Sequence, residues 1–127
     1  MAQISKENRD PLTEYIIACC FTVHNELGPG FPERIYHKSL IEVLKEEGIK
    51  YESEKDIEVT FRGKSIGKFR CDLIIEDHVI VELKAVTGIM PVLFHHQVLA
   101  YLKAAKIKTG ILINFGNKSC DLKRLSM

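Results

Sequence analysis

The chain has 127 residues, of which 46% are apolar and 28% are charged, and its formal net charge is +1. This length suits one compact domain, and the apolar share is sufficient for a folded core, which argues against a disordered chain. No apolar run approaches the roughly 18 residues of a membrane span, and the first residues lack the order of a signal peptide. We therefore expect a cytoplasmic protein that does not associate with a membrane.

Charges and cysteines add two further expectations. Residues 100–127 contain six basic residues and one acid, whereas residues 42–58 contain seven acids and three lysines. This asymmetry fits either a basic face that contacts phosphate or ordinary solvated surfaces of helices and a tail. The four cysteines have no Cys-x-x-Cys spacing, so we expect reduced thiols in a core.

The N-terminal part predicts a polar lead followed by a helix. Residues 1–9 are expected to be flexible, and residues 10–127 are expected to form a single domain. Asp10 and Pro11 are typical of a helix start, since aspartate caps the first turn and proline fits within it. Apolar residues then recur at helical spacing until the Gly-Pro-Gly stretch at 28–30 ends the helix.

A second helix and three consecutive strands are expected next. The helix begins near Pro32 and is ended by Gly48, and its apolar residues recur at helical spacing. Alternating or continuous apolar residues predict strands at 57–61, 66–75 and 79–85. The first of these strands alternates between apolar and polar residues, which indicates that one of its faces is buried.

The last third of the chain predicts a crossover connection. Pro91 opens a third helix, and the continuous apolar run at 110–114 indicates a buried strand. A strand, a helix and a buried strand in that order predict a right-handed crossover between parallel strands. Residues 122–125 are expected to add a short edge strand, so the fold class is α/β with a mixed central sheet.

Charged side chains interrupt two of the strand-like runs, at Asp72, Glu82 and Lys84. Glu82 and Lys84 share a face, and Asp72 joins them if the intervening turn has an odd number of residues. The two carboxylates would then lie about 5 Å apart at Cβ, which requires a proton or a cation between them. Mg²⁺ would fit, with the Leu83 carbonyl as a further ligand and Lys84 positioning the attacking water.

A simpler interpretation of the same residues remains open. Asp72 and Lys84 could form a cross-strand salt bridge, with Glu82 at a solvated strand end. Acids near a Glu-x-Lys sequence occur often by chance, so the pattern alone does not decide between the two interpretations.

Two further polar residues fall on inward-facing helical stripes. Glu33 precedes Tyr36 and Leu40 on the expected sheet-facing stripe of the second helix, where it could bind a metal or hydrogen-bond to a metal-bound water. Its alternative role is a favourable interaction with the helix N-terminus. Gln97 lies one turn before Tyr101 and could contact phosphate or water, or be an ordinary boundary residue.

Five stretches in this order resemble the GxxExxY protein family, which is placed in the PD-(D/E)xK nuclease-like superfamily. They include Gly-x-x-Glu-x-x-Tyr at residues 30–36, and the others lie at residues 69–72, 81–85, 97–103 and 110–116. Cys71 stands where a proline often precedes the signature acid, and Phe94-His95-His96 replaces the residues common in relatives. The resemblance spans about residues 12–116.

The resemblance implies a restriction-endonuclease-like core, α-β-β-β-α-β, with an additional N-terminal helix. It implies a Mg²⁺- or Mn²⁺-dependent nuclease (a hydrolase) that acts on nucleic acid, with DNA as the expected substrate. Asp72, Glu82 and Lys84 match its signature residues, Glu33 its helical acid and Gln97 its helix-borne glutamine. The alternatives are a non-catalytic module that binds nucleic acid or protein, and a structural domain. A homodimer is compatible with either function.

Overall fold

The computed structural model describes residues 10–127, so the predicted lead at residues 1–9 lies outside the described part of the chain. Helices and strands alternate as expected for an α/β fold: α1 (Pro11–Leu27), α2 (Glu33–Glu46), β1 (Tyr51–Phe61), β2 (Lys64–Ile75), β3 (Val79–Lys84), α3 (Val92–Ala105), β4 (Thr109–Asn114) and β5 (Asp121–Ser126). Within residues 10–127, every helix is too short or too polar to cross a bilayer.

The five strands form one mixed sheet in the order β1-β2-β3-β4-β5. The β1–β2, β2–β3 and β4–β5 pairs are antiparallel, and β3 pairs with β4 in parallel through the crossover that contains α3. The predicted restriction-endonuclease-like fold class, with its mixed central sheet and additional N-terminal helix, is thereby confirmed.

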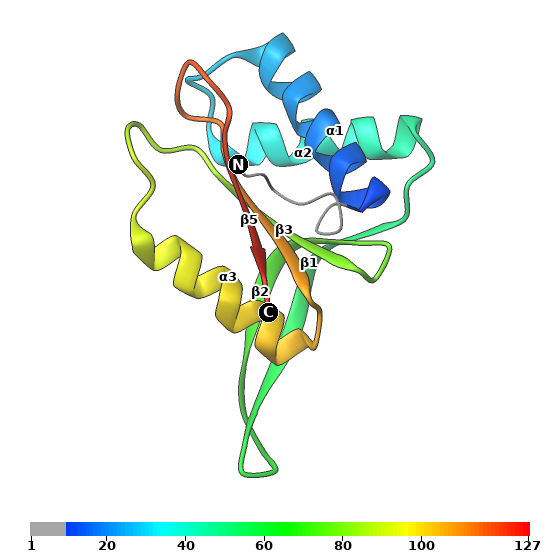
Figure 1. Cartoon of the computed structure of the whole chain (residues 1–127), viewed down its shortest axis with the longest axis vertical. Helices are drawn as coiled ribbons and strands as arrows, with labels where there is room; N and C mark the ends of the chain where they lie inside the picture. The colour runs from blue at the N-terminus through cyan, green and yellow to red at the C-terminus, as the bar shows by residue number, and fades with distance from the viewer. Residues whose placement is uncertain (1–9) are drawn as a thin grey trace.

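Two hydrophobic cores lie on opposite faces of the sheet (Figure 1). Helices α1 and α2 pack on one face, where Tyr36, Leu40 and Phe115 are fully buried. Helix α3 packs on the other face through Val98 and Leu102. Because both faces of the central strands are covered, β3 and β4 are buried almost throughout, as expected for parallel strands.

The helix boundaries follow from local chemistry. The Asp10 side chain accepts a hydrogen bond of 2.7 Å from the Thr13 amide, a cap worth about 1 kcal/mol. Helix α2 ends at Glu46, two residues before the glycine that was expected to end it, and Gly48 then adopts a positive φ of 71°.

One expectation about β1 is wrong. Its alternation predicted a half-buried strand, and Ile57 is indeed buried, but Val59 and Phe61 are 37% and 61% exposed. The β1–β2 hairpin continues past the edge of α3 into solvent, as the lower part of Figure 1 shows. We call residues 58–68 the arm, because all of them are exposed. Alternation therefore identified the strand correctly, but nothing packs against its distal half.

Candidate active site

The register of β2 against β3 sets the position of the two strand acids. The turn between these strands has three residues, 76–78, and Leu73 lies opposite Val81. The same register puts Asp72 opposite Glu82. The odd-numbered turn meets the condition for a common site that the sequence left open.

Side chains replace main-chain pairing at this point of the sheet. Oε1 of Glu82 accepts a hydrogen bond of 2.8 Å from the N–H of Asp72. Oδ2 of Asp72 accepts one of 2.8 Å from the N–H of Leu83. Each acid is thus oriented by the strand that carries the other, which fixes both carboxylates in the gap where the β2–β3 ladder ends.

Strand β2 also changes faces at Asp72. Leu73 packs in the core beneath α1 and α2, whereas Cys71, two residues away, packs in the core beneath α3. Residues two apart on a regular strand share a face, so β2 must rotate locally between them. On the neighbouring strand, Glu54 has a positive φ of 53° and is skipped in the pairing. Asp72 therefore lies at a distortion that affects both β2 and the neighbouring strand β1.

Each carboxylate retains one oxygen for a ligand. Oδ1 of Asp72 and Oε2 of Glu82 make no hydrogen bond with another group in residues 10–127. No fully buried side-chain oxygen in this part of the chain lacks a partner, so both of these atoms reach solvent. Two accessible oxygens from facing carboxylates match the ligands that Mg²⁺ takes from proteins.

The electrostatics favour a positive charge between the two acids. Glu82 is only 6% exposed. Burial, followed by repulsion from Asp72, raises the pKa of Glu82 to about 8, although the hydrogen bond from Asp72 and the nearby Lys84 act against the rise. At neutral pH the pair therefore holds a proton that a bound cation would displace.

Lys84 lies beside this pair without forming an ion pair with it. Its Nζ atom is 4.3 Å from the centre of the Phe94 ring, a cation–π contact between the end of β3 and the start of α3. Within residues 10–127, no ion pair joins Lys84 to Asp72. The interpretation of these residues as a cross-strand salt bridge is therefore wrong. Lys84 remains near enough to lower the pKa of Glu82.

Glu33 approaches the same acids from the first turn of α2. It remains exposed, so only part of the expected stripe, namely Tyr36, Leu40 and Leu44, is buried. Desolvation and repulsion from Asp72 raise the pKa of the Glu33 carboxyl, and Lys84 opposes the rise. The Tyr36 hydroxyl donates a hydrogen bond of 2.6 Å to the Gly28 carbonyl, which fixes the loop before α2.

Gln97 belongs to the helix face that borders the acids. Phe94, Gln97 and Tyr101 recur at helical spacing, so they share one side of α3. Phe94 contacts Lys84, and the pKa of Tyr101 is raised by burial and then by Glu82 and Asp72. Gln97 shares the side of α3 that carries Phe94 and Tyr101, and its side chain makes no hydrogen bond with residues 10–127.

The groups that hold the loop after β3 were not predicted from the sequence. Asn114 is fully buried; its side chain accepts from the amides of Val86 and Gly116 and donates to the Val86 carbonyl. Asn117 makes the corresponding pair of bonds with Gly88. A polar residue at the end of an otherwise apolar strand was the available signal for Asn114. These bonds position the segment that follows Lys84.

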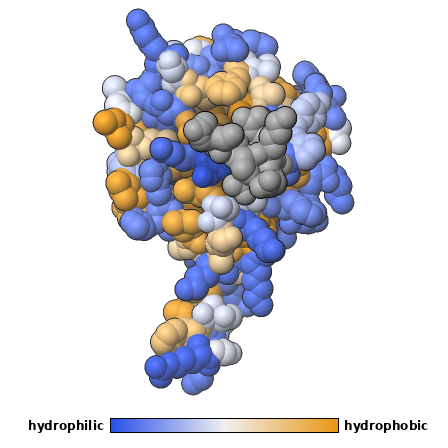
Figure 2. All heavy atoms as spheres, viewed as in Figure 1, coloured by the Kyte–Doolittle hydropathy of each residue, from blue (hydrophilic) through white to orange (hydrophobic). Residues whose placement is uncertain are grey.

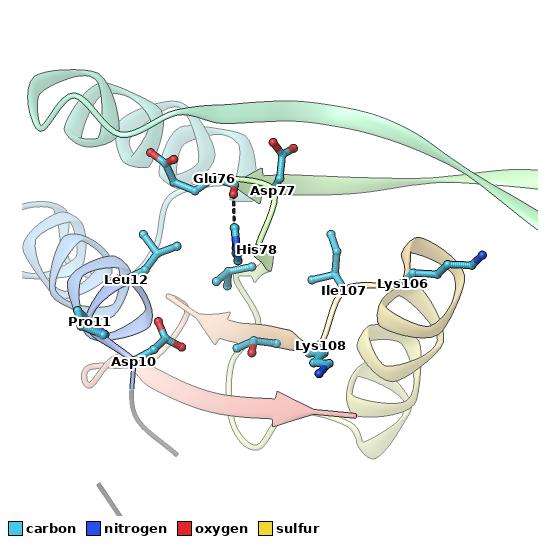
Figure 3. A pocket seen from close by; sticks show the side chains of 11 residues that line it. Asp10, Pro11, Leu12, Glu76, Asp77, His78, Lys106, Ile107 and Lys108 are labelled. Carbon is cyan, nitrogen blue, oxygen red and sulfur yellow. Dashed lines mark hydrogen bonds between the residues drawn. The ribbon is translucent and has the colours of Figure 1, made fainter. Parts of the chain in front are cut away.

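A separate cavity lies at the other end of the sheet. It has a volume of about 800 Å³ and is lined near the starts of β3 and β4, by residues that include His78 and Lys108 (Figure 3). Lys84 and Asn114 are at the opposite ends of those strands. The predicted site residues are not among the lining residues, so this cavity is separate from the acidic pair.

The donor set fits a divalent ion held by two carboxylates. In residues 10–127, no group of three or more His, Cys, Asp or Glu side chains is arranged to hold a metal ion. Glu33 therefore does not complete a three-carboxylate cluster, and water or the Leu83 carbonyl would have to fill the other positions. Mg²⁺ commonly retains several waters and binds through one or two carboxylates, so two protein acids are sufficient.

Comparison with protein-family models identifies the family to which this chain belongs. The family model of the PD-(D/E)XK nuclease superfamily matches residues 10–125. The chain belongs to the PD-(D/E)XK nuclease superfamily. Members of this superfamily generally use divalent metal ions and act on nucleic acid. Among curated proteins, the chain has no significant match.

Two solved structures are similar to this PD-(D/E)XK chain. The crystal structure of SSO0001 has 25% identity and a TM-score of 0.60, over 73% of this chain and 48% of that one. An alkaline exonuclease (LHK-Exo) from Laribacter hongkongensis has 10% identity and a TM-score of 0.42, over 68% and 51%. The second similarity is too weak to support an argument. The chain spans about half the length of each structure.

Proposed function

We propose that this protein is a metal-dependent nuclease that hydrolyses phosphodiester bonds in DNA, with Mg²⁺ or Mn²⁺ as cofactor. The observation that carries the proposal is the pairing of Asp72 with Glu82 across β2 and β3. Each carboxylate is held by a main-chain N–H, and each presents one free, solvent-accessible oxygen. Membership of the superfamily supports the same reaction class.

The roles of the residues follow from their positions. A divalent ion bound at the free oxygens would neutralise charge on the phosphate and lower the pKa of a bound water. Asp72 and Glu82 would hold this ion, with the Leu83 carbonyl completing the set. Lys84 would orient the attacking water or stabilise the charge that develops on the phosphate. Its ammonium group already lies over the Phe94 ring.

The two helix-borne polar residues would act from the border of the site. Glu33 is electrostatically coupled to Asp72 and Lys84, so it would hydrogen-bond to metal-bound water and adjust the charge of the site. Gln97 lies on the same side of α3 as Phe94 and Tyr101, so its amide would contact a phosphate or the attacking water.

A second candidate is a module that binds nucleic acid or protein without cutting. The observation that favours it is the position of Lys84, whose ammonium group rests on Phe94 instead of pairing with either acid. Against it stands the raised pKa of Glu82. Two facing acids destabilise the fold when both are ionised, and a site without function gains nothing by retaining them.

Three finer proposals accompany the nuclease assignment. The motif at Gly30, Glu33 and Tyr36 supports placement in the GxxExxY family, since Tyr36 fixes the loop that leads to Glu33. We also propose a cytoplasmic location, which the reduced cysteines support. A homodimer would extend the small recognition surface of a single protomer.

Cleavage assays test the main proposal directly. Purified protein is incubated with single-stranded, duplex and branched DNA in the presence of Mg²⁺ or Mn²⁺, beside the Asp72→Asn and Lys84→Ala variants. Cleavage is expected only with the metal and the wild-type chain. Exposed Glu26→Gln provides a matched control that should cut normally. Equal cleavage by wild type and both site variants would mean a contaminating nuclease and remove the proposal.

A further inference from the structure

The arm extends from the body of the protein as a two-stranded ribbon. Residues 58–68 are all exposed, and no helix covers either of their faces (Figure 1). An isolated two-stranded ribbon is only marginally stable in water, so an extension of this kind gains little for the fold itself. Its surface chemistry therefore indicates what the arm contacts.

Three cations without an ion-pair partner lie along the arm, Arg62 and Lys64 at its tip and Lys68 opposite Glu58 nearer its base. Arg62, Lys64 and Lys68 form no ion pair within residues 10–127, whereas Arg70, nearer the body, pairs with Asp56 at 3.2 Å. The one acid of the arm, Glu58, accepts a hydrogen bond from Ser65. The arm therefore has a net positive charge, although the whole chain is nearly neutral.

Large apolar side chains lie among these cations. Phe61 is 61% exposed and Ile66 is 65% exposed. The Arg62 guanidinium lies 5.2 Å from the centre of the Phe61 ring. Figure 2 shows the resulting mixture of apolar and polar surface on the projecting part of the molecule. Exposed apolar side chains beside cations can wedge between the base steps of a duplex while the cations bind its phosphates.

The conformation of the turn separately indicates that the Arg62 side chain has a role other than forming the turn. Arg62 and Gly63 both have positive φ angles, 52° and 78°, and they connect the paired residues Phe61 and Lys64. A two-residue hairpin turn of this kind strongly prefers Asn-Gly or Asp-Gly. An arginine is unfavourable there on conformational grounds, so turn formation does not explain it.

The arm and the acidic pair are joined by one strand, β2. Phe69, at the base of the arm, stacks on Tyr101 of α3 with ring centres 4.2 Å apart. Strand β2 then leads directly from Lys64 at the tip to Asp72. Eight residues of strand separate these positions by about 26 Å, which is the length of about eight base pairs of duplex.

We propose that the arm is a nucleic-acid-binding element that holds the substrate roughly eight base pairs from the acidic pair. Arg62, Lys64 and Lys68 contact phosphates, and Phe61 with Ile66 wedges against base steps in a groove of the duplex. This inference deepens the proposed nuclease function and rests on it for the identity of the ligand. A second copy of the chain is a poorer occupant, because two tips of the same positive charge repel each other.

Binding measured without metal separates the arm from catalysis. Fluorescein-labelled DNA of about 20 base pairs, long enough to span the arm and the acids, is titrated with protein in EDTA at several salt concentrations. The variant Arg62→Ala/Lys64→Ala/Lys68→Ala is expected to weaken binding at least about tenfold. The magnitude of the negative slope of log K against log salt should decrease by about 2 to 3, the number of phosphate contacts removed.

A matched variant controls for net charge. Lys38→Ala/Lys103→Ala/Lys123→Ala removes the same charge from exposed positions on α2, α3 and β5. It is expected to leave the slope nearly unchanged. Equal losses of affinity in the two triple variants, or no loss in the arm variant, would overturn the proposal, as would failure of the wild-type chain to bind DNA.

A single substitution distinguishes recognition from a structural role. Arg62→Asn places a residue that suits the turn, so thermal stability should be kept or should rise, while DNA affinity falls. Unchanged affinity would contradict the proposal. If arm variants instead converted a dimer to a monomer in sedimentation experiments without affecting DNA affinity, the arm would be a dimer contact. If DNA binding depends on the arm but no DNA is cleaved, the proposed nuclease function is refuted and the proposed role of the arm in binding stands.

Discussion

Oε1 of Glu82 accepts a hydrogen bond of 2.8 Å from the main-chain N–H of Asp72, the acid that faces it on the neighbouring strand. The bond does two things. It holds the buried Glu82 carboxyl in place, and it directs the second oxygen of that carboxyl toward solvent. The reciprocal bond from Leu83 to Asp72 has the same effect on the other acid. The site is therefore preorganised by the backbone before any ligand binds.

The stability of the metal-free protein should fall as the pH rises. Because the pKa of Glu82 is about 8 in the folded chain, above its ordinary value of 4.5, the folded state retains a proton that the unfolded state loses. The stabilisation is present below about pH 4.5 and is lost as the pH passes 8. The expected loss between pH 6 and 9 is on the order of 2–4 kcal/mol.

Thermal unfolding in EDTA measures this dependence. Glu82→Gln keeps an oxygen that accepts from Asp72 but cannot ionise, so its unfolding temperature should vary less between pH 6 and 9. Exposed Glu26→Gln should retain the wild-type dependence. Parallel pH curves for wild type and Glu82→Gln would refute a raised pKa at this position.

Binding of Mg²⁺ or Mn²⁺ should release a proton at neutral pH. With a pKa of about 8, Glu82 is mostly protonated at pH 7, and a cation at its free oxygen must displace that proton. Calorimetric titration in two buffers of different ionisation enthalpy should report release of nearly one proton at pH 7 and much less at pH 9. Glu82→Ala should abolish binding. Unaltered binding by that variant would place the ion elsewhere.

Removal of Lys84 should impair catalysis far more than folding. Lys84→Ala loses a cation–π contact worth about 0.5–1 kcal/mol, so a small change in unfolding free energy is expected. DNA cleavage should fall by a factor on the order of 100 or more. Phe94→Leu removes the aromatic ring but leaves the charge, and should retain most of the activity. A larger loss of cleavage activity in Phe94→Leu than in Lys84→Ala would mean that Lys84 has a structural role.

Replacement of Asn114 should destabilise the loop after β3. Asn114→Ala leaves the Val86 amide, the Val86 carbonyl and the Gly116 amide without their side-chain partner. An unpaired buried polar group costs about 1–3 kcal/mol, so a loss of several kcal/mol is expected in urea unfolding. Asn117→Ala, whose bonds to Gly88 are exposed, should cost clearly less. Equal costs would contradict this account.

Gly116 and Gly67 form a second matched pair. A Cβ atom at Gly116 would lie 2.2 Å from the Val86 carbonyl oxygen, so the two backbones can approach only because residue 116 lacks a side chain. Gly116→Ala should cost about 2–3 kcal/mol and disturb the segment after Lys84. At Gly67 nothing lies within 4 Å of such an atom. Gly67→Ala should therefore leave the unfolding free energy nearly unchanged.

Local patterns predicted most of the secondary structure because they record which surfaces are buried. Asp10 and Pro11 marked the start of α1, and the continuous apolar run at 110–114 marked a strand covered on both faces. The same patterns failed at Val59 and Phe61, where strand alternation continues into the exposed arm. Alternation reports the conformation of a strand, but only the packing of α3 decides how far along it burial extends.

The order of residues was enough to identify a candidate metal site: two acids and a lysine within apolar strands, where charge is costly unless it serves a purpose. It could not determine the register, since a shift by one residue would have placed Asp72 on the other face. The folded chain was needed to show that Asp72 and Glu82 face each other, that Lys84 rests on Phe94, and that Asn114 supports the loop after β3. These contacts join segments far apart in the chain, and their geometry depends on the pairing of whole strands and not on local preference.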